Sequence, residues 1–175
     1  MKRPDLARVP QFYHNYINLV QGDDMNRSLD ETAQAMLDFL AAIPEDKWLF
    51  RYAEGKWSIN EMVQHLIDAE RIFGYRALCI ARGETASLPG FDENKYAAAS
   101  KADSRTKAAL LQELQAVQEA TCLLFQSFDE GQLERFGVAN NNSIQVRAIG
   151  FITAGHKLHH KNILQERYLK HLSHS

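Results

Sequence analysis

Three histidines fall within five positions of the stretch GHKLHHKNI, residues 155–163. Two of them, His156 and His160, are four residues apart, so on a helix their imidazoles lie on the same side, one turn from each other. Two ring nitrogens placed in this way can bind one divalent ion. A third imidazole from a facing helix would complete a three-histidine site with positions open for water or substrate.

The direction of each histidine follows from the turn of about 100° per residue in an α-helix. With His156 as the origin, His160 lies at about 40°, and the isoleucines at positions 149, 152 and 163 lie within about 40°. Both histidines therefore occupy the middle of an apolar stripe that faces the core. His159, at about −60°, lies on the margin of that stripe.

A third core-facing histidine comes from the helix that WSINEM begins. Met62 and Ile72, among other apolar residues, lie within about 60° of the direction of His65. A buried imidazole without a partner costs about 1–3 kcal/mol. Spacing alone favours a metal site and hydrogen-bonded core histidines equally. Lys157 occupies the glutamate position of the H-E-x-x-H motif, which argues against a peptidase of that type.

Two acidic residues flank His65 on the same helix. Glu61 follows Ser58 by three positions, which is the spacing of a capping box, so a structural role is favoured for it. Asp68 is the preferred candidate to assist the metal site, or to accept a hydrogen bond from the second nitrogen of His65. The alternative for Asp68 is a surface ion pair with Arg71.

Arg76 and Cys79 lie further along the same stripe. Arg76 points within about 20° of His65, about three turns on, and there it needs a carboxylate or an anionic substrate. An acid on the first long helix is favoured as its partner over a substrate. Cys79, some 20 Å from His65, is too distant to be a ligand. The remaining histidines have no partner at such spacing and are expected at the surface: His14, His171 and His174.

Four stretches with helical periodicity must position these residues, and no strand pattern is convincing. They cover about 29–43, 59–82, 103–128 and 143–169. Ser28 and Glu31 have the spacing of a capping box at the first start. A short additional helix is predicted within residues 11–20. Together these elements predict an all-α, antiparallel four-helix bundle with long loops, as a single domain over residues 1–175.

The connections also carry candidate residues. Residues 83–101 form a loop of about 19 residues, and loops of this length are often lids or binding loops. Asp92 and Glu93 would reach the site if this loop folds over it, although a solvated loop is the default. The segment 129–142 is polar and rich in Asn and Gly, which indicates a second connection.

Composition narrows the range of partners and locations. The net charge is −2 and comes from interspersed acids and bases, so nucleic acid is a poor candidate partner. No run approaches the length of a membrane span, and the N-terminus lacks the apolar core of a secretory signal. Cys79 and Cys122 are then expected to be reduced thiols of a cytoplasmic protein.

The segments YAEGKWSINEMVQHLIDAERIF and GHKLHHKNILQERYL resemble the DinB-like, or YfiT-like, metal-dependent enzymes. This is the damage-inducible four-helix family, which is distinct from the DNA polymerase of the same name. Carried over to this sequence, the metal triad of the family falls on His65, His156 and His160. The resemblance implies a divalent metal, zinc or nickel, and a homodimer. A second apolar stripe on the last helix needs cover from a neighbouring helix or from such a partner: Ile144, Phe151 and Leu158.

The expected chemistry follows from the ligand set. Three neutral histidines leave the charge of a divalent ion uncompensated, so the ion lowers the pKa of a bound water toward about 7 and deprotonates a bound thiol. A metal-dependent enzyme that activates a small thiol or water is therefore favoured. The resemblance implies that an S-transferase acting with a low-molecular-weight thiol ranks ahead of a hydrolase, because some members of that family are such transferases. The alternative is a non-catalytic metal-binding or small-ligand-binding protein of the bacterial stress response.

Overall fold

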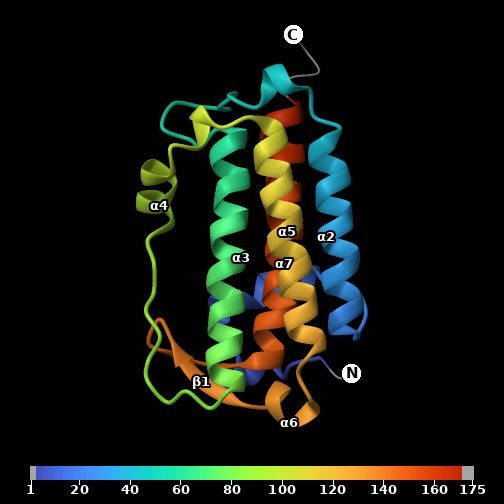
Figure 1. Ribbon diagram of the computed structural model, residues 1–175, viewed down its shortest axis with the longest axis vertical. Coiled ribbons are helices and arrows are strands. Elements are labelled where there is room, and N and C mark those ends of the chain that lie inside the picture. Colours follow the sequence, from blue (N-terminus) through green and yellow to red (C-terminus); the bar gives the residue numbers. More distant parts are fainter. Residues whose placement is uncertain (1–2, 171–175) are drawn as a thin grey trace.

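The computed structural model describes residues 3–170, and four long helices form its bundle (Figure 1). The long helices are α2 (Met25–Ala41), α3 (Ile59–Ala81), α5 (Lys107–Gln126) and α7 (Val146–Ile163), and α7 continues as the π-helix η5 (Leu164–Leu169). Both α5 and α7 pack against α2 and against α3. The predicted four-helix bundle is confirmed.

The long connection between α3 and α5 sets the directions of the helices. It leaves the lower end of α3 and returns along the side of the bundle, so that α5 starts at the same end as α3 (Figure 1). These two neighbours therefore run parallel, whereas α3 with α7 and α2 with α5 are antiparallel. The cavity described below borders this returning segment.

The connection is not a continuous loop as the sequence predicts. It contains the helix α4 (Glu93–Ser100) and the 3-10 turn η4 (Ala102–Ser104). The carboxylate of Asp92 accepts hydrogen bonds from two backbone N–H groups at the start of α4, which caps the helix. Periodicity could not reveal α4, because Ala97 is its single buried residue.

A β-hairpin precedes α7, against the expectation that the chain has no strands. Strand β1 (Phe136–Ala139) pairs antiparallel with β2 (Asn142–Gln145), and α7 consequently begins at residue 146 rather than near 143. The turn residues Asn140 and Asn141 have φ of 51° and 60°, a conformation that asparagine tolerates. Strands of four residues are too short for their alternation to be recognised. The short helix α6 (Glu130–Leu133) lies before the hairpin.

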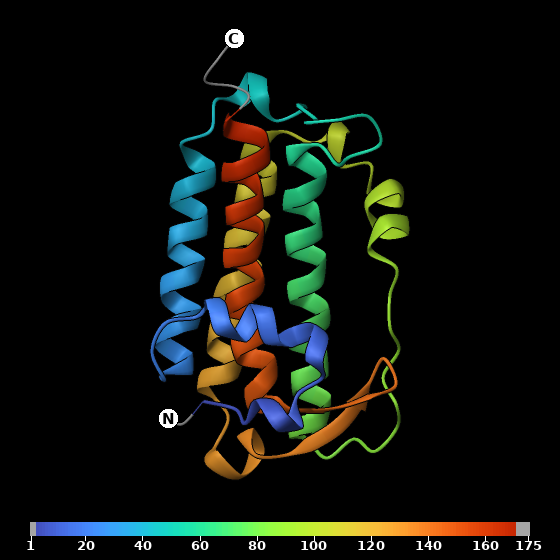
Figure 2. The same cartoon turned by 180° about the vertical axis from the view of Figure 1, so that it is seen from behind.

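The N-terminal segment crosses the back of the bundle over α7 (Figure 2). It consists of η1 (Leu6–Arg8), η2 (Gln11–Tyr13) and α1 (His14–Leu19), and α1 confirms the predicted short helix. Gly155 makes this crossing possible, since a Cβ atom at that position would lie 1.9 Å from the carbonyl oxygen of Tyr16. The absence of a side chain beside His156 therefore lets α1 approach α7 closely.

Two predicted helix starts have different outcomes. The capping box of Ser58 and Glu61 at α3 is confirmed. The box predicted at Ser28 is wrong, because α2 begins earlier, at Met25, with Asp24 as its cap. Ser28 is buried inside the first turns, where its hydroxyl donates to the carbonyl of Asp24. The third long helix, in contrast, starts later than predicted, after Thr106.

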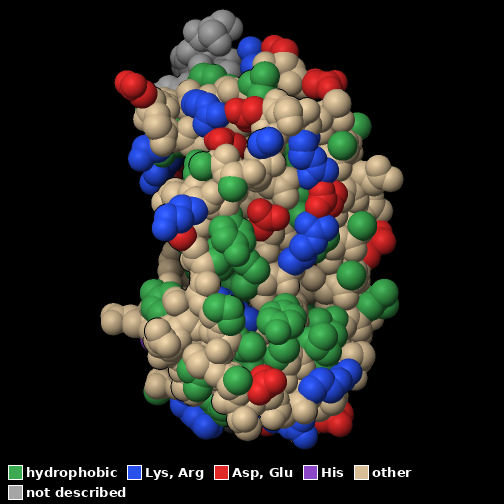
Figure 3. All heavy atoms as spheres, turned by 60° about the vertical axis from the view of Figure 1, so that its left-hand side comes forward, with side chains coloured by type: hydrophobic (Ala, Val, Ile, Leu, Met, Phe, Trp, Pro, Cys, Tyr) green, Lys and Arg blue, Asp and Glu red, His purple; other side chains and the backbone are tan. Residues whose placement is uncertain are grey.

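The second apolar stripe of α7 is covered within the chain. Ile144 and Phe151 are buried in the core, and Leu158 packs against it. This stripe therefore needs no second copy of the chain for its burial. On the face that carries α4, acidic and basic side chains are interspersed, and apolar ones gather in its middle and lower part (Figure 3). None of the helices within residues 3–170 combines the length and hydropathy that a membrane span requires.

Candidate metal centre

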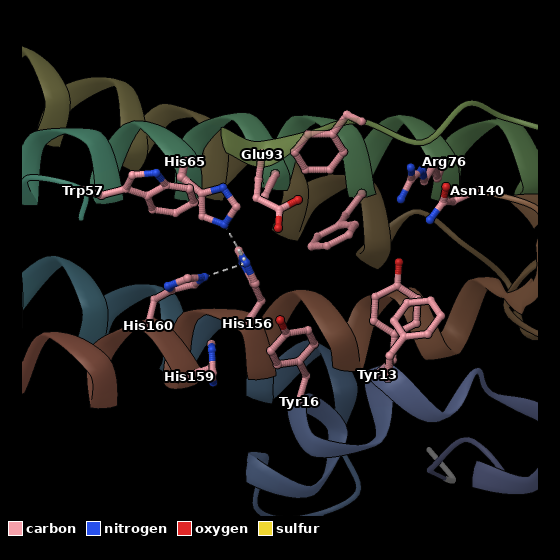
Figure 4. Close-up of a pocket in the computed structure, with 14 residues that line it drawn as sticks. Tyr13, Tyr16, Trp57, His65, Arg76, Glu93, Asn140, His156, His159 and His160 are labelled. Carbon is pink, nitrogen blue, oxygen red and sulfur yellow. Dashed lines mark hydrogen bonds between the residues drawn. The ribbon is translucent and has the colours of Figure 1, made fainter. Parts of the chain in front are cut away.

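Three histidines from two helices converge inside the bundle (Figure 4). Nε2 of His156 lies 3.1 Å from Nε2 of His65 on α3 and 3.0 Å from Nε2 of His160. All three residues are buried, with 6–8% of their surface exposed. One ligand nitrogen from each ring lies within 4.8 Å of the others. The structure thus brings together the three histidines selected from the sequence.

Hydrogen bonds alone do not satisfy this cluster. Each ring nitrogen carries either one hydrogen or one lone pair in the plane of the ring. Nε2 of His156 faces two other ring nitrogens, so it makes one well-formed hydrogen bond and leaves the other contact without one. A divalent ion accepts a lone pair from all three rings, and tetrahedral zinc holds such nitrogens about 3.3 Å apart. The donor set therefore fits a single ion.

Burial keeps the three rings neutral. It lowers the pKa of His65 from 6.5 to about 4, with a smaller contribution from His159. The pKa values of His156 and His160 are well below the ordinary value, first because of burial and then because of the neighbouring histidines. Neutral imidazole is the form that binds a metal, so no proton has to be displaced at pH 7.

The cluster stands at one end of a cavity of about 400 Å³. The ring of Tyr16 meets that of His156 edge-on at a centroid distance of 5.5 Å, and the ring of Trp57 lies 4.8 Å from that of His65. Further aromatic side chains line the cavity: Phe12, Tyr13, Phe73 and Phe91. A concave, mostly aromatic space with a few polar groups is typical of a small-molecule site.

The family model of the DinB superfamily matches residues 28–164 of the chain. The chain belongs to the DinB superfamily. The match begins within α2 and covers the rest of the four-helix bundle, including all three histidines of the cluster. No curated protein is significantly similar to this DinB chain.

Solved structures share the DinB fold. YfiT from Bacillus subtilis, described as "a probable metal-dependent hydrolase with an unusual four-helix bundle topology", is 15% identical, with a TM-score of 0.75 over 97% of this chain and 93% of YfiT. A mycothiol-dependent maleylpyruvate isomerase is 9% identical, with a TM-score of 0.67 over 79% of this chain and 58% of the isomerase. The DinB-like protein YjoA from Bacillus subtilis is 20% identical, with a TM-score of 0.61 over 86% of this chain and 92% of YjoA. In this DinB protein the three histidines of the cluster offer one ligand nitrogen each, a donor set that can hold a single metal ion.

The other histidines lie outside the cluster. His159 borders the same cavity from the margin of the α7 stripe, as its direction predicts, and its ring lies 5.2 Å from that of Tyr16. Burial lowers its pKa. His14, which is half-buried, contacts the carbonyl oxygen of Val9 at 2.8 Å. His171 and His174 lie outside the described residues.

The two acids that flank His65 in the sequence have other partners. Glu61 completes the capping box and pairs with Arg51. Asp68 accepts a hydrogen bond from Gln64 at 2.9 Å and borders a separate hollow, and burial raises its pKa. Its proposed assistance to the metal site stays a prediction. Arg71, the alternative partner of Asp68, forms its ion pair with Glu113.

Three further polar residues line the DinB cavity. Glu93 reaches the cavity from the first turn of α4. Asp92, which caps the N-terminus of this helix, is the sequence signal that could have revealed it. Arg76 and Asn140 lie at the end away from the histidines (Figure 4). The partner of Arg76 is not an acid on α2, since its Nη2 donates to the carbonyl oxygen of Pro89 at 2.7 Å. Asn140 carried no sequence signal beyond its turn.

Proposed function

We propose that the chain is a metal-dependent enzyme that holds zinc or nickel on His65, His156 and His160 and activates a small thiol for S-transfer. The observation that carries the proposal is the convergence of three buried, neutral imidazoles at one end of an aromatic cavity of about 400 Å³. When bound there, a divalent ion lowers the pKa of a thiol or water that joins it, so that either becomes a nucleophile at neutral pH.

The residues of the chain supply binding, orientation and proton transfer. The aromatic wall excludes water from the second substrate, and the edge of the Tyr16 ring fixes the plane of His156. The thiol S–H bond breaks and its proton passes to the carboxylate of Glu93, which lines the cavity. The sulfur uses the electron pair of the former S–H bond to form a bond to the electrophilic carbon. The bond between that carbon and the leaving group breaks, and its electron pair departs with the leaving group.

Two of the similar solved structures guide the choice between a thiol and water as the nucleophile. The mycothiol-dependent isomerase shares the fold, which favours a low-molecular-weight thiol. The description of YfiT as a hydrolase makes water the second candidate. We further propose a cytoplasmic location, where such thiols are kept reduced, and a homodimer, as the family resemblance implies.

The direct test incubates the metal-loaded protein with an aromatic chloride electrophile and cysteine, glutathione or mycothiol, and measures conjugates by mass spectrometry. The wild type should exceed His156→Ala by at least about 100-fold, and Glu93→Gln should lower the rate about 10- to 100-fold with the metal retained. His14→Ala is the matched control and should leave the rate unchanged.

The outcomes separate the candidate functions. If no thiol reacts faster with the wild type than with His156→Ala, the transferase proposal is rejected. Hydrolysis of an aryl ester that depends on His156 would then favour the hydrolase. Stoichiometric metal without either activity would favour a non-catalytic metal-binding protein of the stress response.

A further inference from the structure

Arg76 on α3 is a buried cation that no carboxylate neutralises. The residue is 5% exposed, and its Nε is buried without a hydrogen-bond partner. Its Nη2 donates a hydrogen bond to the backbone carbonyl of Pro89, which carries no net charge. Within residues 3–170 no salt bridge includes Arg76. Burial of a charge without a counter-ion is strongly unfavourable, so this arrangement needs an explanation.

The other buried lysine and arginine of residues 3–170 do have acidic partners. Lys157 pairs with Glu70 at 3.0 Å. Arg147 pairs with Glu130 and with Glu134. This fold therefore supplies a carboxylate to a buried cation where the cation has a structural role. The missing carboxylate at Arg76 points to an anion that comes from outside the chain.

The position of Arg76 shows where this anion would lie. Arg76 is in the wall of the histidine cavity, at the opposite end from the cluster, together with Asn140 and Tyr13 (Figure 4). The positive charge of Arg76 acts on the hydroxyl of Tyr13 and partly offsets the rise that burial causes in the pKa of Tyr13. Glu93, the acid in the cavity wall, is exposed and forms no ion pair with Arg76 among residues 3–170.

Backbone contacts hold this end of the cavity in place. The N–H of Asn140 donates to the carbonyl of Leu88 at 2.9 Å, and the N–H of Leu88 donates to the carbonyl of Val138 at 2.9 Å. Gly90 lies close beside them: a Cβ atom there would lie 2.1 Å from Oδ1 of Asn140, so the side chain of Asn140 would have to move. The hairpin turn and the segment at Pro89 therefore present their polar groups to Arg76 as one unit.

We infer that Arg76, with Tyr13 and Asn140, binds a carboxylate of the substrate, so that the cavity takes an elongated organic acid. This inference rests on the proposed function and names its substrate class. One guanidinium, one hydroxyl and one amide match the single charge and planar shape of a carboxylate, which a guanidinium binds through paired N–H groups.

The distance between the two ends of the cavity sets the length of this acid. Arg76 follows His65 by about three turns, or roughly 16 Å, along α3. The rings of Tyr16, Phe73 and Phe91 belong to the apolar lining of the same cavity. The ligand therefore has a carboxylate at one end, an apolar middle and its reacting group at the histidines.

Calorimetric titration of the metal-free protein tests the subsite without interference from carboxylate binding to a metal. The probes are 5-phenylpentanoate and 5-phenyl-1-pentanol, which share the apolar body and differ in charge. The wild type should bind the acid at least about 10-fold more tightly than the alcohol. Arg76→Gln should abolish this preference. Arg82→Gln removes an exposed cation next to Phe128, outside the cavity, and should retain the preference.

Equal affinity of the wild type for the two probes would overturn the inference. A preference that survives in Arg76→Gln would also overturn it, and would show that Arg76 only fastens the segment at Pro89. The comparison of probes on the wild type needs no variant, so it stands if Arg76→Gln fails to fold. A lost carboxylate preference in a protein that binds metal rejects the subsite alone. A retained preference in a protein without metal affinity rejects the proposed function alone.

Discussion

Lys157 and Glu70 form a buried ion pair beside the histidine cluster, with both carboxylate oxygens 3.0 Å from Nζ. Their side chains are 2% and 3% exposed. Lys157 directly follows His156 on α7, and Glu70 lies on α3 as His65 does. The pair therefore joins the same two helices as the histidines and fixes the position of one helix against the other.

Breaking this pair on one side should destabilise the bundle. Lys157→Met leaves the carboxylate of Glu70 buried without a counter-charge, and we expect the free energy of unfolding to fall by about 3–5 kcal/mol. The double variant with Glu70→Leu removes both charges and should regain most of that loss. Urea denaturation of the wild type and both variants measures this. A single variant as stable as the double variant would contradict a structural ion pair.

Gly155 should not tolerate a methyl group. Gly155→Ala forces the new Cβ against the backbone of Tyr16, so α1 must shift away from His156, and we expect a loss of about 1–3 kcal/mol. Gly74→Ala on α3 is the matched control, because its Cβ would lie 3.8 Å from the nearest side chain, that of Leu124. The control should be as stable as the wild type or slightly more stable, since alanine favours a helix. Equal melting temperatures for the two variants would contradict the close crossing of α1.

The stability of the metal-free protein should fall as the pH is lowered below neutrality. The pKa of His65 is about 4 in the folded protein and about 6.5 when unfolded, so between these values the unfolded chain binds more protons. The contribution of His65 to the free energy of unfolding is therefore fully present above about pH 6.5. Protonation of this residue alone should lower that free energy by about 2 kcal/mol between pH 7 and pH 5. Thermal unfolding at several pH values checks this. A His65→Gln variant should show a shallower pH dependence, and a dependence as steep as that of the wild type would contradict the assignment.

Trp57 should report metal binding. Its ring centroid lies 4.8 Å from that of His65, whereas Trp48, the other tryptophan, is buried in the second apolar cluster of the bundle. Nickel bound at the histidines should quench the emission of Trp57 through its unpaired electrons. Trp57→Phe should lose the nickel-dependent change and keep the emission of Trp48. An unchanged response in Trp57→Phe would place the ion elsewhere.

The histidine cluster could be predicted from the sequence because helical geometry turns position into direction. His65, His156 and His160 each stand in the middle of an apolar stripe, and polar residues there need a shared partner. The direction of Arg76 into the core was predictable on the same basis. Its neighbours were not, because Pro89 and Asn140 come from a loop and a hairpin turn, which have no helical period.

Three differences from the sequence prediction have separate physical causes. Glu93 reaches the cavity on α4, whose sequence lacks an apolar stripe. The hydrogen bond of Asp68 goes to Gln64, one turn earlier, since the choice between partners depends on rotamers rather than spacing. The length of α2 was underestimated because Ser28 has capping spacing although it is buried within the helix.

Metal content is the most direct test of the three-histidine centre. The protein should be purified without a nickel resin and its zinc and nickel measured by inductively coupled plasma mass spectrometry. We expect about one ion per chain in the wild type and in His159→Ala, and almost none in His65→Ala, His156→Ala or His160→Ala. A wild type without stoichiometric metal, whose melting temperature is also unchanged by added zinc or nickel, would contradict the metal centre.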